Sequence, residues 1–194
     1  EYTPNYTGTM TIGYDGSLGT ITKLDDLLKP VFKGKVTING DPQGSSAGLN
    51  SIFMVNLALG GTLDDISPAV AWFKKLKQVG NYINVNPTQA TIASGQTPVV
   101  MDNGYISAGI AKEFAKAGKT WKMFTPASLG STYNSAVSAW APHPACARLW
   151  MEYTLGEEGA AIWAVGGATP TLWIWMVKTG RAPAAGLAAI GKSK

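Results

Sequence analysis

The chain has 194 residues, of which 45 % are hydrophobic and 14 % are charged, and its formal net charge is +4. This composition supplies a sizeable core and excludes disorder over most of the length. The basic residues are dispersed, and the densest cluster (Lys74, Lys75, Lys77) lies on one expected helix face, so no nucleic-acid partner is expected. One cysteine, Cys146, excludes an intrachain disulfide, and with one histidine, His143, the chain lacks the ligands of a structural zinc site.

Strand-like and helix-like patterns alternate along the sequence. Strands are expected at residues 9–14, 35–38, 98–101, 121–124 and 132–138. Helices are expected at residues 23–28, 46–59, 68–79, 88–93, 103–117, 145–155 and 157–165. The segment after Arg181 is rich in alanine and glycine and indicates a loosely packed helix. This alternation, with short joints of glycine and proline, predicts an α/β fold in which helices flank a β-sheet.

Local capping signals set the expected helix boundaries. Thr22 with Asp25 forms an approximate capping box for the first short helix. Ser67 followed by Pro68 predicts an N-cap with proline at the first helical position. The apolar face of that helix is expected to contain Ala69, Trp72, Phe73, Leu76 and Val79.

The most informative stretch is residues 99–105, where a buried strand ends abruptly in polar residues. Asp102, Asn103 and Tyr105 follow the apolar run, and a helical pattern begins at once. In open α/β sheets, ligands bind beyond the carboxyl ends of the strands, and backbone N–H groups at a helix start attract anions. The alternative is that Asp102 or Asn103 is simply the N-cap of the following helix.

A second polar strand end follows the strand at residues 35–38. Ser45 and Ser46 offer hydroxyl and helix-start N–H groups for a carboxylate or phosphate, and plain N-capping is the equally weighted alternative. Asp41 is suited to a cationic ligand, although a turn-forming Asp-Pro pair is the commoner meaning. Together with Tyr133 and Asn134 on a later strand, these residues are predicted to converge at one edge of the sheet.

Several segments, read in order, resemble a known family. The segment at residues 6–14 (YTGTMTIGY) resembles a hinge strand, and residues 27–36 (LLKPVFKGKV) resemble the entry into a second lobe. Residues 92–96 (IASGQ) precede the strand that ends at Asp102, and residues 142–159 resemble a return helix with its Glu-Gly joint. Over roughly residues 6–171 the chain is similar to the second half of a type II periplasmic solute-binding protein of the polyamine- and ferric-ion-binding group.

This resemblance implies a type II periplasmic-binding-protein-like lobe with a mixed β-sheet, from which the first lobe is largely missing. Residues 1–14 would be the lead-in and hinge strand, residues 15–130 the second lobe, and residues 131–194 the return strand and C-terminal helices of the first lobe. It also implies an ABC-transporter substrate-binding protein, periplasmic or extracellular, that delivers a small solute to a transmembrane permease. No cofactor is implied. No signal peptide opens the chain, and no run reaches the roughly 18 apolar residues of a membrane span.

The resemblance also bears on the solute. The ferric-binding relatives use adjacent tyrosines where this chain has Gly104 and Tyr105, so a tight iron site lacks a principal oxygen donor. The polyamine-binding relatives place a carboxylate where this chain has Tyr133 and Asn134, and an amide does not pair with an ammonium as a carboxylate does. The expected solute is therefore a small polar or zwitterionic organic molecule.

Two competing functions follow from the residues themselves. An enzyme is not expected, because the chain has no Gly-x-Ser-x-Gly elbow and no P-loop, and Asp41 with Asp102 forms no recognisable hydrolase pair. The alternative to a transport protein is a repurposed fragment that binds or inhibits a macromolecule. The resemblance implies that the helices after Pro142 pack on the first lobe, so an apolar surface is expected there, either exposed or covered by a partner chain. Its residues would include Leu149, Trp150, Tyr153, Ile162 and Trp163.

Overall fold

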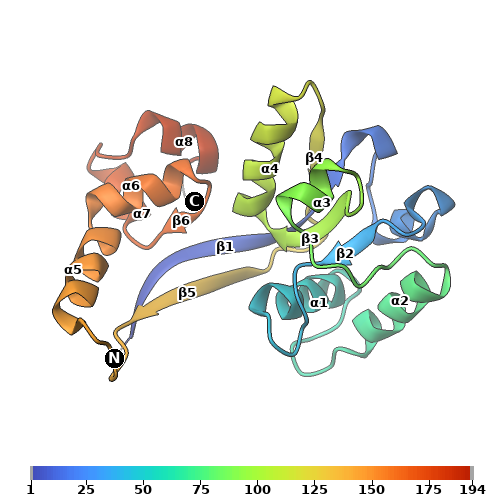
Figure 1. Cartoon of the computed structure of the whole chain (residues 1–194), viewed down its shortest axis with the longest axis horizontal. Coiled ribbons are helices and arrows are strands. Elements are labelled where there is room, and N and C mark those ends of the chain that lie inside the picture. The colour runs from blue at the N-terminus through green and yellow to red at the C-terminus, as the bar shows by residue number, and fades with distance from the viewer. Residues whose placement is uncertain (1, 193–194) are drawn as a thin grey trace. The chain divides into compact units, whose positions relative to one another are not determined.

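The structure, a computed structural model, describes residues 2–192 and contains two compact units. The central unit is Thr9–Leu129. The terminal unit combines the residues before Thr9 with those from Gly130 onwards. Residues 1, 193 and 194, at the outer ends of the expected segments, lie outside the described residues. Strand β1 (Tyr2–Asp15) contributes to both units (Figure 1).

The sheet is mixed and six-stranded, which confirms the predicted α/β class. Its main path runs β2 (Val36–Ile38), β3 (Val99–Asn103), β1 and β4 (Trp121–Phe124). β2 and β3 are parallel, whereas β1 is antiparallel to β3 and to β4. β5 (Gly130–Ala136) and β6 (Thr169–Pro170) also pair with β1, so the hinge-like strand and the return strand are neighbours.

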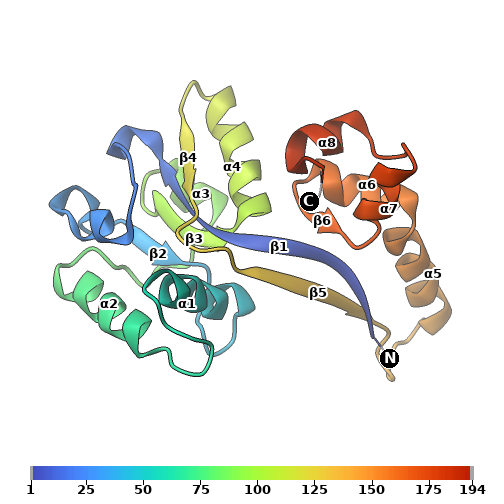
Figure 2. The ribbon, with the colours of Figure 1, turned by 180° about the vertical axis from the view of Figure 1, so that it is seen from behind.

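Helices flank both faces of the sheet in the central unit. Three short 3₁₀ helices, η1 (Gly16–Leu18), η2 (Leu24–Leu28) and η3 (Pro30–Phe32), precede β2. α1 (Ser46–Ala58) and α2 (Ser67–Gln78) lie on one side of the sheet. α3 (Gln89–Ala93) and α4 (Gly104–Lys116) lie on the other side (Figures 1 and 2).

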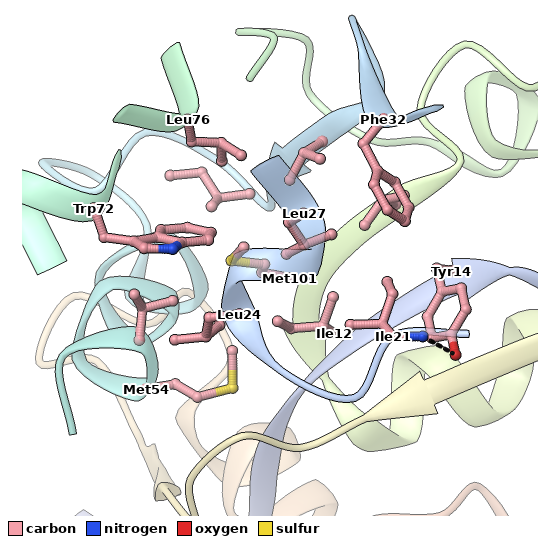
Figure 3. Close-up of a cluster of buried hydrophobic side chains, with 14 of the residues drawn as sticks. Ile12, Tyr14, Ile21, Leu24, Leu27, Phe32, Met54, Trp72, Leu76 and Met101 are labelled. Atoms are coloured by element: carbon pink, nitrogen blue, oxygen red, sulfur yellow. Dashed lines mark hydrogen bonds between the residues drawn. The ribbon is translucent and has the colours of Figure 1, made fainter. Parts of the chain in front are cut away.

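The apolar run of β3 is uninterrupted because both of its faces are covered. Met101 and Val99 pack in the larger core with Trp72 and Leu76 of α2 (Figure 3). Val100, which points to the opposite face, packs in a second cluster with Ile92, Phe114 and Trp121. A strand buried on both sides reads as continuous hydrophobic sequence rather than as an alternating pattern.

Two capping residues lie one position away from where the sequence predicts them. Asp26, not Asp25, completes the cap before η2: its Oδ2 atom accepts the N–H groups of Thr22 and Lys23 at 2.9 and 3.1 Å. α2 has Ile66 rather than Ser67 as its N-cap, and Ser67 N–H donates to Asp65 at 2.9 Å.

Two other boundaries and one burial prediction also differ. Val79 is exposed, because it follows the last residue of α2 and leaves the buried face of that helix. The late strand begins at Gly130, not at residue 132. β3 continues through Asn103, so α4 begins at Gly104.

The terminal unit has its own small core. α5 (Pro144–Leu155), α6 (Glu157–Val165), α7 (Trp173–Lys178) and α8 (Ala184–Ile190) follow β5. Ala160 and Ala164 of α6 pack with Trp173 and Met176 of α7. Gly159 allows α6 to approach α5 closely, since a Cβ there would lie 2.5 Å from the carbonyl oxygen of Tyr153.

An apolar surface is exposed on this unit, as the resemblance to a chain without its first lobe implies. Leu149 is 71 % exposed, Trp150 65 % and Ile162 62 %, and Tyr153 is also exposed. Trp163 is the exception: its ring stacks on Tyr6 with centroids 4.1 Å apart, and the side chain is half-buried. Within residues 2–192, no helix combines the length and the apolar character needed to cross a membrane.

Candidate ligand-binding site

The parallel strands β2 and β3 end side by side, and their next residues are polar. Ile38 pairs with Met101 in register, and Asn39 N–H donates to the carbonyl oxygen of Met101 at 3.2 Å. The side-chain amide of Asn39 donates to Asp102 Oδ2 at 2.8 Å. The two strand ends are therefore joined by backbone and by side chain at the edge where α/β sheets bind ligands.

Asp102 is a nearly buried carboxylate with few partners. Asp102 is only 3 % exposed, and its Oδ1 atom accepts the N–H of Asn103 at 2.7 Å. Burial raises the pKa of Asp102 above its usual range, while the hydrogen bonds from Asn103 and Asn39 act in the opposite direction. Desolvation outweighs these bonds, so the ionised carboxylate is held here at a cost in free energy.

The N-terminus of α1 is fastened to the same strand end by Ser45. The Ser45 hydroxyl donates to the carbonyl oxygen of Asn39 at 2.8 Å and accepts Gly48 N–H at 3.2 Å. Gly48 has no room for a side chain, because a Cβ would lie 2.5 Å from the carbonyl oxygen of Gly40. The capping role of Ser45 is thus present, and the continuous chain Ser45–Asn39–Asp102 holds the helix start beside β3.

Asp41 and Ser46 are the exposed members of the predicted set within the central unit. Asp41 Oδ1 accepts Gln43 N–H at 2.9 Å, and its carbonyl oxygen accepts Ser45 N–H at 2.7 Å. This is the turn-forming role that an Asp-Pro pair favours, and it leaves the other carboxylate oxygen toward solvent. Ser46 is the first residue of α1, where backbone N–H groups have no intrahelical carbonyl partner.

Asn103 and Tyr105 flank the first residue of α4. Asn103 is 2 % exposed and is the N-cap of α4, although its side chain makes no capping hydrogen bond. Tyr105 is half-buried in the first turn of the helix. Gly104 permits a close approach to β1, since a Cβ there would lie 3.2 Å from the carbonyl oxygen of Thr9.

Tyr133 and Asn134 belong to β5 in the terminal unit. Tyr133 stacks on Tyr6 with ring centroids 4.9 Å apart, and Asn134 is exposed. Tyr6 in turn stacks on Trp163, which makes a row of three aromatic rings within that unit. The part that Tyr133 and Asn134 play in binding stays a prediction.

The sequence patterns did not indicate two further residues of this strand end, Asn39 and Ser51. Asn39 bonds Asp102, and the Ser51 hydroxyl donates to the carbonyl oxygen of Met101 at 3.2 Å from within α1. The signal for Asn39 was available, because it follows β2 as Asp102 follows the apolar run of β3. Across residues 2–192 no cluster of three or more histidine, cysteine or acidic residues is placed to hold a metal ion.

The sequence matches the family described as bacterial extracellular solute-binding protein over residues 1–185. The chain belongs to this family. A comparison with curated proteins found no match.

Several solved structures have the same fold. The periplasmic binding protein AfuA from Actinobacillus pleuropneumoniae, with bound fructose-6-phosphate, has a TM-score of 0.66 and 20 % identity, over 88 % of this chain and 55 % of that one. Iron-bound HitA from Pseudomonas aeruginosa has a TM-score of 0.55 and 22 % identity, over 82 % and 52 %.

A third structure comes from the polyamine-binding side of the group. The spermidine/putrescine ABC transporter substrate-binding protein PotD from Streptococcus pneumoniae has a TM-score of 0.57 and 15 % identity, over 83 % of this chain and 50 % of that one. This chain therefore spans about half the length of these proteins. The resemblance to a type II solute-binding protein of the polyamine- and ferric-ion-binding group is confirmed at the level of the fold.

Proposed function

We propose that the chain is part of an ABC-transporter substrate-binding protein that captures a small polar organic solute and delivers it to a transmembrane permease. Membership of the solute-binding family supports the binding role. In this proposal the protein is periplasmic or extracellular, binds its solute between two lobes and catalyses no reaction. Residues 15–130 would form the second lobe, and residues 1–14 and 131–194 would be the segments that connect to and belong to the first lobe.

The observation that carries the proposed site is the row of hydrogen bonds that joins Ser45, Asn39 and Asp102 at the ends of two parallel strands. In this proposal the exposed start of α1 at Ser46 and the half-buried Tyr105 would face the solute at this sheet edge. An anionic end of the solute would bind the free N–H groups at Ser46, and Tyr105 would contact its apolar part. AfuA, whose structure contains fructose-6-phosphate, supports a phosphate-bearing solute as one member of this class.

In this proposal Asp102 has a structural role and is not an exposed counter-ion for the solute. Both of its oxygens accept hydrogen bonds, and the residue is almost fully buried. It would orient Asn39 and, through it, the loop that carries Asp41 and Ser45. Asp41, which is exposed, would then be the carboxylate that reaches a donor or cationic group of the solute.

The test is binding of fructose 6-phosphate, spermidine and Fe³⁺, each followed by chemical shifts of the backbone amides. We expect the sugar phosphate to perturb the amides of residues 45–47 and 103–106. Ser46→Asp places a carboxylate at the helix start, where it favours the helix but repels an anion. That variant should bind the sugar phosphate at least about tenfold more weakly, or about 1.4 kcal/mol.

The matched control is Ser67→Asp, which makes the same change at the first residue of α2. It should leave the affinity unchanged. Equal weakening in both variants would mean a general effect of charge and would reject the site at α1. If fructose 6-phosphate, spermidine and Fe³⁺ all leave residues 41–46 and 102–105 unperturbed at millimolar concentration, the proposed solute class and site are wrong.

The exposed apolar surface favours a second candidate, a fragment of the solute-binding fold that binds a macromolecule. Leu149, Trp150 and Ile162 are large apolar side chains that are each more than 60 % exposed, and exposed apolar patches mark interaction surfaces. A partner chain that covers this surface is the corresponding proposal. A stable macromolecular complex together with no small-molecule binding would favour this candidate over solute transport.

A further inference from the structure

A groove runs along α2 in the central unit, beside the Asp41 loop of the strand-end site. It has a volume of about 290 Å³ and lies between α1, α2 and the end of β2. Its wall is apolar and is formed by Ile38, Ile52, Val70 and Phe73. The volume is at the lower end of the range of about 300–1,000 Å³ that ligand pockets occupy, so it suits a small molecule.

The α2 side of the groove is a second stripe of that helix, distinct from its buried stripe. Ala69, Trp72 and Leu76 pack in the core. Val70, Phe73, Lys74 and Lys77 line the groove, at the i, i+3, i+4, i+7 spacing of one helix face. The seven-residue separation of the outer two corresponds to about 10 Å along the helix axis. The stripe is apolar in its first half and basic in its second half.

The two basic side chains of the groove are not neutralised. Among residues 2–192, neither Lys74 nor Lys77 forms an ion pair or a hydrogen bond through its side chain. Phe73 is held in place by edge contacts with Trp72, at 5.1 Å between ring centroids, and with Tyr82, at 6.2 Å. The apolar wall is therefore fixed by the core, and the ammonium groups stay available.

Helix electrostatics alone does not account for this arrangement. Lysine residues in the last turn of a helix are favourable because they oppose the negative end of the helix dipole. Lys75 and Lys77 both lie in that turn, yet only Lys77 lines the groove. Lys74 lines the groove although it precedes the two lysines of the last turn. The lysines of the stripe are therefore those that face the groove, not those nearest the end of the helix.

Negative charge is present on the opposite side of the groove. Pro42 lines that side, and the adjacent Asp41 lies close enough for its charge to act on Tyr82, another lining residue. An anion in the groove is repelled from the Asp41 loop and attracted to Lys74 and Lys77. The charge distribution thus favours one orientation of an elongated ligand, with its acidic group on the α2 side.

We propose that this groove binds a small amphipathic anion, an apolar chain or ring that carries one carboxylate, with the carboxylate at Lys74 and Lys77 and the apolar part against Phe73 and Ile52. The proposal does not depend on the proposed transport function. Octanoate is the probe, and octan-1-ol and octylammonium are its chemical controls, because they keep the chain and change only the charge of the head group.

The first measurement is a titration of the native chain with octanoate, followed by the methyl shifts of Ile38, Ile52 and Val70. These three methyl groups should move together, with saturation at millimolar concentration. Octan-1-ol should bind more weakly, and octylammonium more weakly still. Shifts confined to Ile92 and Ile110, which line a different apolar pocket, would place the ligand elsewhere and overturn the assignment.

The second measurement compares three charge variants of α2. Lys74→Glu/Lys77→Glu should weaken octanoate binding at least about tenfold, because two attractive ion pairs become repulsive. Lys75→Glu changes the same charge in the same turn of the helix and should change the affinity less than about twofold. Val70→Trp, at a position that is 39 % exposed, fills the apolar half and should remove octanoate binding while the circular dichroism spectrum stays native.

Three results would each reject the proposal. The first is an absence of methyl shifts with millimolar octanoate in the folded native chain. The second is equal weakening by Lys75→Glu and by the double variant, which would mean a nonspecific charge effect. The third is equal affinity for octanoate and octan-1-ol, which would mean that the lysines do not recognise the head group.

Discussion

The bond between Asn39 and Asp102 should stabilise the fold measurably, and by an amount that depends on pH. The amide of Asn39 donates to Asp102 Oδ2 at 2.8 Å, across 63 positions of sequence. A hydrogen bond to a charged group contributes about 1.5–3 kcal/mol net. Asn39 is only half-buried, so we expect the lower part of that range, and we expect Asn39→Ala to lower the free energy of unfolding by about 2 kcal/mol at neutral pH.

The dependence on pH follows from the direction of the pKa shift. Burial raises the pKa of Asp102, so the folded chain holds the proton of this carboxyl more tightly than the unfolded chain does. The stability that Asp102 contributes through protonation is therefore greatest below the ordinary pKa of 3.8 and is lost as the pH rises through the raised value. The bond from Asn39 favours the ionised form, so its contribution is largest above the raised pKa and falls by about half once Asp102 is protonated.

A double-mutant cycle of Asn39→Ala and Asp102→Ala isolates the contribution of the Asn39–Asp102 hydrogen bond to the free energy of unfolding. Urea unfolding followed by circular dichroism, at pH 7 and at a pH below 3.8, gives the coupling free energy at each pH. The control cycle pairs Asn39→Ala with Thr88→Ala, which removes the N-cap of α3 near the start of β3 rather than its end. That pair should be additive within about 0.5 kcal/mol. A coupling below about 0.5 kcal/mol between Asn39 and Asp102, or one equal at both pH values, would refute the reasoning.

Two further predictions concern the framework of the central unit, and one concerns the apolar surface. Asn56→Ala should cost about 3 kcal/mol in urea unfolding, because the buried Asn56 bonds Thr62, Asp65 and Ala69, whereas Asn50→Ala on the same helix should cost less than about 1 kcal/mol. Hydrogen bonds from Lys29 and then from the Thr22 backbone hold the pKa of Asp26 well below its usual range, so the stability they provide is present above 3.8 and is lost as the pH falls. The melting temperature of Asp26→Asn should therefore lie below that of the native chain at pH 7, and the gap should narrow in acid. The exposed apolar surface should drive association in sedimentation velocity, and Trp150→Lys should reduce it; a native chain that stays monomeric at high concentration would contradict this.

The order of strands and helices could be predicted because each boundary has a local chemical cause. Ser45 caps α1, one of the two roles that the sequence indicates for it, since an N-cap bond forms within four residues of the chain. Thr88, expected as the first residue of the helix at residues 88–93, is the N-cap of α3. The apolar run before Asp102 forms a strand covered on both faces. The residue pattern alone does not predict the first part of β1, residues 2–8, because its polar sequence contains Pro4 and its pairing with β6 depends on residues more than 160 positions away. Only the resemblance to a hinge strand extends the expected strand back to Tyr6.

The candidate site could be predicted in place but not in detail. Parallel neighbouring strands bring their carboxyl ends to one edge, and this rule locates Asp102 beside the start of α1. The burial of Asp102 and its bond to Asn39 depend on register between distant segments, which residue types do not encode. Sequence reasoning accordingly treated Asp102 as a solute contact, whereas in the structure its two oxygens bind Asn39 and Asn103.

The C-terminal end of β3 also differs from the rest of the core in how its burial affects the stability of the fold. Val99, Val100 and Met101 are buried apolar side chains, so their burial stabilises the sheet. Asp102 and Asn103 are buried as deeply, yet burial raises the pKa of the carboxyl, which means that its charge is not fully compensated. Residues that lower stability at one strand end, while the surrounding strand follows the packing rules, are typical of sites maintained for binding rather than for folding.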